Sequence, residues 1–131
     1  EDMVQLSIQL GVEKYVDFKG SVDAITLIKF LDESDIFVLA SRTEGLPRAI
    51  VEAMSRALPC VGSDVGGIPE LVSEDLLFNS ENSLELALRI KSLILEPIFY
   101  EISSRYSLQK ASAFSPDILE ERRLSFFKSI F

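Results

Sequence analysis

An apolar run, a Gly-Leu-Pro turn and an amphipathic pattern follow one another between residues 36 and 57, and together they constrain the fold more than any other feature. Residues 36–40 form an unbroken β-rich run, which is typical of a parallel strand that is covered on both faces. Residues 41–46 then form the loop at the carboxyl end of this strand, and Pro47 suits the first position of a helix. One face of that helix carries Ile50, Met54 and Ala57. The stretch therefore predicts a strand-loop-helix unit whose loop ends at a helix N-terminus.

The rest of the chain alternates between strand and helix patterns, which indicates an α/β fold with a parallel sheet and helices on both faces. The predicted helices of the first part cover residues 2–10, 22–32 and 47–57, with a short helical turn at 68–72. The predicted strands cover residues 15–19, 36–40, 59–62 and 75–78. From Ser83 onward the pattern is wholly helical. Asn82 or Ser83 caps a helix that Pro97 ends, a second helix covers residues 98–112, and Ser115-Pro116 begins the last one.

Length and composition limit the class of protein. A chain of 131 residues makes one domain, which buries roughly two-thirds of its unfolded surface. The net charge of −8 and the scattered Lys and Arg argue against nucleic-acid binding. No apolar run approaches the roughly 20 residues that span a bilayer, and no basic region precedes a hydrophobic signal core, so we expect a cytoplasmic protein.

The scarcity of Cys and His limits the chemistry further. There is no His, which excludes Ser-His and Cys-His nucleophile pairs within this chain. Cys60 is the single cysteine, so no internal disulfide forms, and no ligand pattern for a zinc site surrounds it. Because Cys60 lies in a predicted buried strand, we expect an inert, packed thiol.

Two carboxylates frame the loop and the helix that follows it. Glu44 lies in the loop, and Glu52 lies about one and a half turns into the helix. Ligands of open α/β sheets bind outside the carboxyl ends of the strands, where helix N-termini favour anions, and both carboxylates could accept hydrogen bonds from sugar hydroxyls there. Each also has a plainer interpretation. Glu44 can be an exposed loop acid beside a helix N-terminus, and Glu52 a solvated helix acid with Arg48 and Arg56 four residues to either side.

The same stretch resembles the signature of glycosyltransferase family 4, the retaining GT-B enzymes. It has a glutamate, seven residues and a second glutamate, with Gly-Leu-Pro after the first and Glu-Ala-Met at the second. Further segments are similar to the strands, the glycine loop and the final helix of that family: Val16 to Gly20, Ser34 to Val38, Leu58 to Val61, Ser63 to Val72, and Phe114-Ser115. The resemblance covers roughly residues 4 to 120.

This resemblance implies that the chain is the Rossmann-like, C-terminal half of a GT-B enzyme, a single partial donor-binding domain that is truncated at its N-terminus. The acceptor domain, and the Arg and Lys that neutralise the donor diphosphate in the family, would lie upstream. The intact enzyme would transfer a hexose-type sugar from a UDP, GDP or ADP sugar to a glycan or lipid-linked acceptor, with retention, and this chain alone would be inactive. Neither a cofactor nor a metal is expected. Peripheral association with the inner face of a membrane remains open for the intact enzyme.

The resemblance also implies roles for individual residues. Glu44, the catalytic candidate, would contact hydroxyls of the transferred sugar, and Glu52 would accept the ribose hydroxyls of the nucleotide. Gly45, Leu46 and Pro47 would contribute backbone, with the N–H groups of Gly45 and Leu46 available to donor oxygens. Gly66-Gly67 can be an anion-binding nest or a tight turn into a short helix, and the turn is favoured.

Other interpretations remain open beside the transferase. A degenerate, non-catalytic domain that serves assembly or regulation would share the fold. A nucleotide-sugar epimerase of GT-B type is a third alternative, which the lack of His and the Glu-Gly-Leu-Pro signature disfavour. The final helix carries much apolar area at Phe126, Phe127, Ile130 and Phe131. These side chains would dock on the missing first domain, pack on the sheet of this chain, or lie on a membrane surface.

Overall fold

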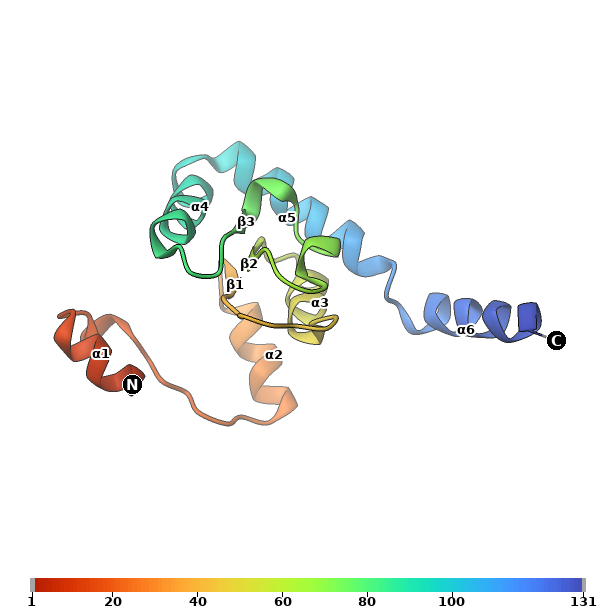
Figure 1. Cartoon of the computed structure of the whole chain (residues 1–131), viewed down its shortest axis with the longest axis horizontal. Coiled ribbons are helices and arrows are strands. Elements are labelled where there is room, and N and C mark those ends of the chain that lie inside the picture. Colours follow the sequence, from red (N-terminus) through yellow and green to blue (C-terminus); the bar gives the residue numbers. More distant parts are fainter. Residues whose placement is uncertain (1, 131) are drawn as a thin grey trace. The chain divides into compact units, whose positions relative to one another are not determined.

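The structure is a computed structural model that describes residues 2–130 (Figure 1). The chain separates into two compact units, which meet in the sequence between Phe30 and Leu31. The second unit holds the sheet and the candidate site.

The first unit contains one helix and the start of a second, and both helices begin at a capping aspartate. α1 (Met3–Gln9) begins where Oδ1 of Asp2 accepts a hydrogen bond of 2.9 Å from the N–H of Val4. Gly11, with a φ of 66°, ends it in the left-handed region. α2 (Ala24–Asp32) begins where Oδ1 of Asp23 accepts a hydrogen bond of 2.8 Å from the N–H of Thr26. Both helices confirm the predicted ranges to within two residues.

The strand predicted at residues 15–19 is wrong. A 3-10 helix (η1, Glu13–Tyr15) occupies its start, and the backbone that follows belongs to no sheet. A strand forms only where a neighbouring strand pairs with its backbone and one of its faces is buried. The side chains of Tyr15, Val16 and Phe18 are all exposed. The alternating apolar residues at 15–19 predicted a half-buried strand, but neither side of this segment is buried.

The second unit is built around a parallel sheet of three strands in the order β1 (Phe37–Leu39), β2 (Cys60–Ser63) and β3 (Leu77–Phe78). Phe37 is paired with Cys60, and Gly62 with Leu77. These strands confirm three of the four predicted ranges, although each is shorter or begins later. Two 3-10 helices, η2 (Ile68–Glu70) and η3 (Glu74–Leu76), connect β2 to β3, and η2 confirms the predicted helical turn.

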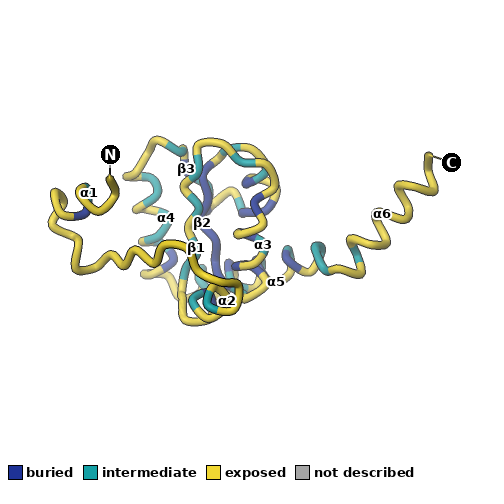
Figure 2. The backbone as a smooth tube through the Cα atoms, turned by 90° about the horizontal axis from the view of Figure 1, so that it is seen from below, coloured by how far each residue is buried: buried dark blue, intermediate teal, exposed yellow. Residues whose placement is uncertain are grey.

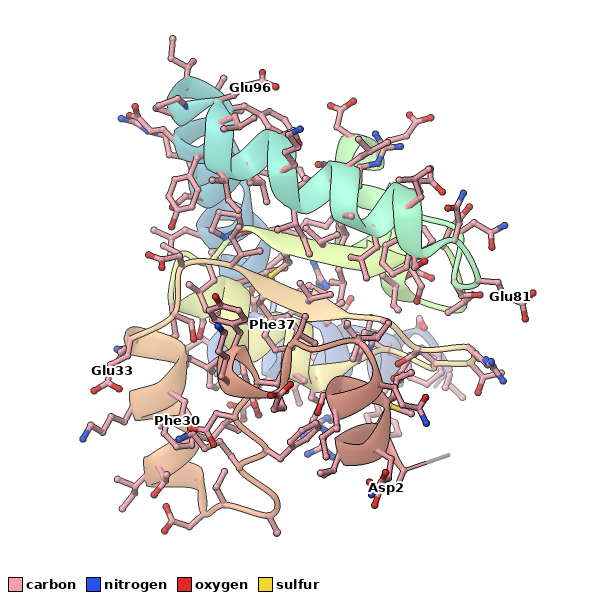
Figure 3. The ribbon with its side chains drawn as sticks, turned by 90° about the vertical axis from the view of Figure 1, so that its left-hand side faces the viewer. Asp2, Phe30, Glu33, Phe37, Glu81 and Glu96 are labelled. Atoms are coloured by element: carbon pink, nitrogen blue, oxygen red, sulfur yellow. The ribbon has the colours of Figure 1, made fainter. Side chains whose placement is uncertain are left out.

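Helices cover both faces of this sheet, as predicted. α3 (Arg48–Ser55) packs against β1 and β2, while α4 (Ser83–Leu95) packs against β2 and β3 from the other face (Figures 1 and 2). Figure 3 shows α4 crossing that face between Glu81 and Glu96. α5 (Pro97–Ser112) packs against both α3 and α4. The unit therefore has the layered, Rossmann-like α/β architecture that the sequence predicts.

Burial follows from this layering. Every residue of the central strand β2 is buried, and the core around it consists of Ile50, Met54, Ile68, Leu71, Phe78 and Leu93, among others. β1 is less protected than predicted, because Val38 is 37% exposed. Of the three strands, α4 packs mainly against β2 and β3. The prediction that residues 36–40 are covered on both faces is therefore wrong at Val38.

The helix boundaries follow local capping chemistry. Oδ1 of Asn82 accepts a hydrogen bond of 3.0 Å from the N–H of Glu85, so Asn82 caps α4, and Pro97 begins α5 directly after α4 ends. Pro47 is the N-cap of α3 rather than its first residue, a shift of one position from the prediction. α3 ends at Ser55, and Ala57, two residues later, has a φ of 60°. Oγ of Ser104 in α5 donates a hydrogen bond of 2.7 Å to the carbonyl of Ala57.

The last helix, α6 (Pro116–Ile130), starts where Ser115-Pro116 predicts it but has no buried residue. Phe126 and Phe127 contact each other edge to face, with ring centroids 5.9 Å apart, and Phe127 is 53% exposed. The interpretation that these side chains pack on the sheet of this chain is therefore wrong. Docking on a first domain and attachment to a membrane surface stay predictions. Phe131 lies outside the described residues. None of the helices described here has the length and apolar character that a membrane crossing requires.

Candidate functional site

The loop after β1 is held by a chain of two hydrogen bonds that begins in the sheet. Ser63 is the last residue of β2 and is fully buried, and its Oγ donates a hydrogen bond of 2.7 Å to the carbonyl of Ser41. Oγ of Ser41 donates a hydrogen bond, also of 2.7 Å, to Oε1 of Glu44. The half-buried carboxylate of Glu44 is thereby tied to the central strand, and its Oε2 has no partner within residues 2–130.

The loop after β2 packs directly against the same segment. The N–H of Gly67 donates a hydrogen bond of 2.9 Å to the carbonyl of Gly45. A Cβ at Gly67 would lie 2.4 Å from that carbonyl oxygen. Gly66 has a φ of 54°, and η2 begins one residue after Gly67. The two glycines therefore form the favoured turn into a short helix. The N–H of Gly67, which an anion nest would need, is already used.

The N-terminus of α3 presents backbone donors. Within the part of the chain that the structure describes, no acceptor is found for the N–H groups of Gly45, Leu46, Arg48 and Ala49, and Pro47 has no side chain that could cap them. Gly45 and Leu46 are exposed. Unpaired N–H groups and the helix dipole together favour an anion or a ligand oxygen at this place.

Glu52 lies on the exposed side of α3, away from the buried Ile50 and Met54. Its carboxylate has no ion pair among the described residues, because Arg56 bonds to Asp32 instead: Nη2 of Arg56 donates to Oδ2 of Asp32 over 2.6 Å, and Nε donates to Oδ1. This hydrogen bond and the charge of Asp32 raise the pKa of Arg56. Arg56, one of the two basic residues four positions from Glu52, therefore pairs with an acid outside α3.

Glu52 also lines a mostly apolar hollow of about 440 Å³ beside α3, rather than the hydrogen-bonded cluster around Glu44. The hollow is bounded by α3, the C-terminal end of α5 and the start of α6. Its other lining residues are Val51, Ser55, Leu108, Ala111, Ser112, Phe114, Ser115 and Pro116. The structure thus gathers Ser41, Glu44, Gly45 and the glycine turn into one cluster and places Glu52 farther along the helix.

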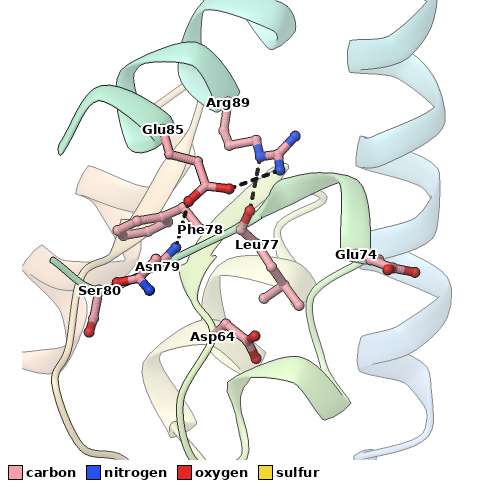
Figure 4. Close-up of a pocket in the computed structure, with 8 residues that line it drawn as sticks. All are labelled: Asp64, Glu74, Leu77, Phe78, Asn79, Ser80, Glu85 and Arg89. Carbon is pink, nitrogen blue, oxygen red and sulfur yellow. Dashed lines mark hydrogen bonds and ion pairs between the residues drawn. The ribbon is translucent and has the colours of Figure 1, made fainter. Parts of the chain in front are cut away.

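A second hollow, of about 320 Å³, lies at the carboxyl end of β3 and contains none of the predicted site residues (Figure 4). Its polar side chains stabilise the connection from β3 to α4. Oε2 of Glu85 accepts a hydrogen bond of 2.9 Å from the N–H of Asn79. Arg89 donates from Nε to the carbonyl of Leu77 over 2.9 Å and from Nη2 to Oε1 of Glu85 over 3.2 Å. With these groups paired to one another, we assign this hollow a structural role.

Cys60 is buried, as predicted, and its Sγ donates a weak hydrogen bond of 3.3 Å to the carbonyl of Leu58. Burial raises the pKa of its thiol to about 12, so the reactive thiolate is absent at neutral pH. In residues 2–130 no three His, Cys, Asp or Glu side chains come together in a way that could hold a metal ion.

Ser41 and Ser63 are functional candidates that sequence reasoning missed. A signal for Ser41 was present, because a serine three residues before an acid in a loop can bond to its carboxylate. No local pattern identifies Ser63. It lies 22 residues from Ser41 in the sequence and reaches it only because β1 and β2 are neighbours.

Comparison with known proteins places these residues in a family. The family profile described as "Glycosyl transferases group 1" matches residues 1–96. Protein CapJ of Staphylococcus aureus is 31% identical over 99 residues, which cover 75% of this chain and 25% of CapJ. The amylovoran biosynthesis glycosyltransferase AmsK of Erwinia amylovora is 42% identical over 69 residues, which cover 48% of this chain and 16% of AmsK.

Comparison with a solved structure identifies the fold. Sucrose-phosphate synthase of Thermosynechococcus elongatus superposes with a TM-score of 0.87 at 20% identity, over 98% of this chain and 33% of that one. The fold is therefore that of a fragment of a GT-B glycosyltransferase. This chain spans at most about a third of the length of these proteins. From the match over residues 1–96 and the identity with CapJ, the chain belongs to the group 1 glycosyltransferases.

Proposed function

We propose that this chain is the donor-binding, C-terminal domain of a retaining glycosyltransferase of family 4. The observation that carries the proposal is the state of Glu44. Ser41 holds one oxygen of its carboxylate, and among residues 2–130 no partner is found for the other oxygen or for the N–H groups of Gly45 and Leu46, the next two residues in the sequence. A fixed acceptor next to free donors suits the hydroxyls of a sugar and the oxygens of a phosphate group.

The residues around Glu44 and the start of α3 have different roles in binding the donor. Glu44 accepts hydrogen bonds from hydroxyls of the transferred sugar. The N–H groups of Gly45 and Leu46, with Pro47 setting the start of α3, receive sugar or phosphate oxygens. Oriented N–H groups at a helix N-terminus stabilise the charge that grows on a departing diphosphate, and they do so without reorganising during the reaction. This chemistry requires no metal or other cofactor.

Glu52 is the proposed acceptor for the ribose hydroxyls of the nucleotide. Glu52 is exposed and lies on α3, the helix whose N-terminus follows Pro47. Its carboxylate forms no ion pair with Arg56, which bonds to Asp32. Glu52 lies four positions after Arg48, the first residue of α3, which corresponds to about 6 Å along a helix axis. That spacing suits a donor whose nucleotide and sugar lie on the two sides of the helix N-terminus.

The whole protein would transfer a hexose-type sugar from a UDP, GDP or ADP sugar to a glycan or lipid-linked acceptor. The name of AmsK, a glycosyltransferase of amylovoran biosynthesis, supports transfer of a sugar in a biosynthetic reaction. The short coverage of the relatives supports a second, acceptor-binding domain elsewhere in the protein. On this proposal the isolated chain binds a donor but has no transferase activity.

Calorimetric titration with UDP, GDP and ADP, each alone and as a sugar conjugate, tests the proposal on this chain and on the full-length protein. We expect one nucleotide to bind saturably. Glu52→Gln should weaken the nucleotide and its conjugate by about tenfold or more, since it removes hydrogen bonds to a charged group. Glu44→Gln should weaken only the conjugate.

The control for these two variants is Glu121→Gln, which removes an exposed carboxylate from α6 and should leave binding unchanged. Absence of nucleotide binding in both proteins would overturn the donor-binding role and favour a non-catalytic domain of the same fold. Equal weakening by all three variants would indicate a general charge effect instead of contacts at Glu44 and Glu52.

A further inference from the structure

We infer that Ser41 is a positioning residue for Glu44, and that Ser63 fixes Ser41 from inside the sheet. The inference deepens the proposed function and rests on it in one respect, the role of Glu44 in holding the donor sugar. The arrangement of the three side chains is itself independent of any ligand.

The hydroxyl of Ser41 selects one orientation of the Glu44 carboxylate. A glutamate has three rotatable side-chain bonds, and fixing such a side chain costs conformational entropy. The bond of 2.7 Å from Oγ of Ser41 to Oε1 fixes the carboxylate before any ligand arrives. A ligand that binds to Oε2 then meets an oriented acceptor, and preorganisation of this kind strengthens binding.

Ser41 needs a rigid support to act in this way, and Ser63 provides it. Ser63 lies in the fully buried central strand, and its Oγ bonds to the carbonyl of Ser41 over 2.7 Å. A second carbonyl, that of Leu39, lies 3.5 Å from the same oxygen. The Ser63 hydroxyl thus joins the end of β2 to the loop after β1, at the residue whose side chain holds Glu44.

The glycine turn supports the same loop from its other side. The N–H of Gly67 bonds to the carbonyl of Gly45, and the absence of a side chain at Gly66 lets the carbonyl of Glu44 approach. The backbone is therefore held on both sides of Glu44, at Ser41 and at Gly45. Its side chain has only the hydroxyl of Ser41 as a partner within the described residues. Removal of that hydroxyl should free the carboxylate without moving the loop.

Two measurements on the full-length protein test the inference, and the first needs no ligand. Three-bond NMR couplings report whether the side chain of Glu44 has one rotamer or several. We expect one rotamer in the wild type, averaged couplings in Ser41→Ala, and a single rotamer again in Ser41→Thr, which keeps the hydroxyl. Averaged couplings in the wild type, or unchanged couplings in Ser41→Ala, would overturn the inference.

The second measurement is the affinity for the nucleotide sugar. Ser41→Ala should weaken the conjugate about five- to tenfold, leave the nucleotide alone unaffected, and cause no further loss when Glu44 is already Ala. Ser63→Ala should weaken the conjugate in the same direction. Ser104→Ala is the matched control. Its hydroxyl also donates over 2.7 Å to a backbone carbonyl, but at the opposite end of α3, so conjugate binding should be unchanged.

The two measurements separate the inference from the proposed function. Suppose that the NMR couplings show one rotamer of Glu44, which Ser41→Ala averages, but the protein binds no nucleotide sugar. That result would contradict the donor-binding role and support the inference that Ser41 positions Glu44. An equal loss of affinity from Ser41→Ala in the wild type and in Glu44→Ala would show that Ser41 acts on the fold in general, and would overturn the inference.

Discussion

A Cβ at Gly66 would lie 1.9 Å from the carbonyl oxygen of Glu44, so the loop after β2 touches the loop after β1 through bare backbone. No side chain fits between them. The position of Glu44 therefore depends on a residue 22 positions later in the sequence, in a turn that no pattern around Glu44 predicts.

Gly66→Ala should destabilise the protein. An alanine at a φ of 54° lies in the left-handed region, which costs roughly 1–2 kcal/mol, and the close approach to Glu44 adds to this. Gly45→Ala is the control, because its Cβ would meet nothing within 4 Å. Urea denaturation should show a lower midpoint for Gly66→Ala only. Equal midpoints would mean that the two loops separate easily.

The N-cap of α4 gives a second prediction. Asn82→Ala removes the acceptor for the N–H of Glu85 and should lower the free energy of unfolding by about 1 kcal/mol. Asn82→Asp retains an acceptor oxygen and should restore most of the loss. Thermal unfolding of the three proteins measures both effects. A loss in Asn82→Asp as large as that in Asn82→Ala would argue against a cap.

Burial along α4 provides a matched pair of leucines. Leu93 is 2% exposed and Leu88 is 56% exposed. Leu93→Ala should cost about 2–5 kcal/mol, because it leaves a cavity in the core, whereas Leu88→Ala should change the free energy of unfolding little. Denaturant unfolding compares them on the same helix. A similar cost for both would mean that α4 buries a different face.

Stability should depend on pH through Cys60. Its pKa is raised from 9.0 to about 12 in the folded protein by burial, so above pH 9 the unfolded chain loses the thiol proton while the folded protein keeps it. The unfolded state then binds fewer protons, and the free energy of unfolding falls with rising pH, by up to about 1.4 kcal/mol per pH unit.

The measurement for Cys60 is the free energy of unfolding between pH 8 and pH 10.5, in the wild type and in Cys60→Ala. The other titrating groups are common to both proteins, so the difference in slope isolates the thiol. We expect the wild type to lose stability faster above pH 9. Parallel curves would contradict a buried, protonated thiol in the folded state.

Local chemistry in the sequence determined most of the secondary structure. The run at residues 36–40, the Gly-Leu-Pro turn and the spacing of Ile50 and Met54 predicted β1 and α3, because strand and helix periodicities are properties of neighbouring residues. Asn82 and Pro97 predicted the ends of α4 for the same reason. The position of Glu44 after a strand and before a helix was also determined locally.

Pairing between distant segments was decided by the tertiary structure alone. Residues 15–19 have a strand pattern but no paired neighbour, and the apolar side chains of α6 have no surface to cover them among the described residues. Arg56 bonds to Asp32, 24 residues away, rather than to the acid on its own helix. Each of these outcomes depends on what lies opposite a residue, which local periodicity does not contain.

In the candidate site, too, some features follow from the local sequence and others from the tertiary structure. The sequence determined which groups it contains: a loop carboxylate, a helix N-terminus, and a second acid on the exposed side of the helix. The tertiary structure decided how they are held, through Ser63, Ser41 and the turn at Gly66-Gly67. Those contacts exist only because the carboxyl ends of parallel strands lie at one edge of the sheet, where loops that are distant in the sequence come into contact.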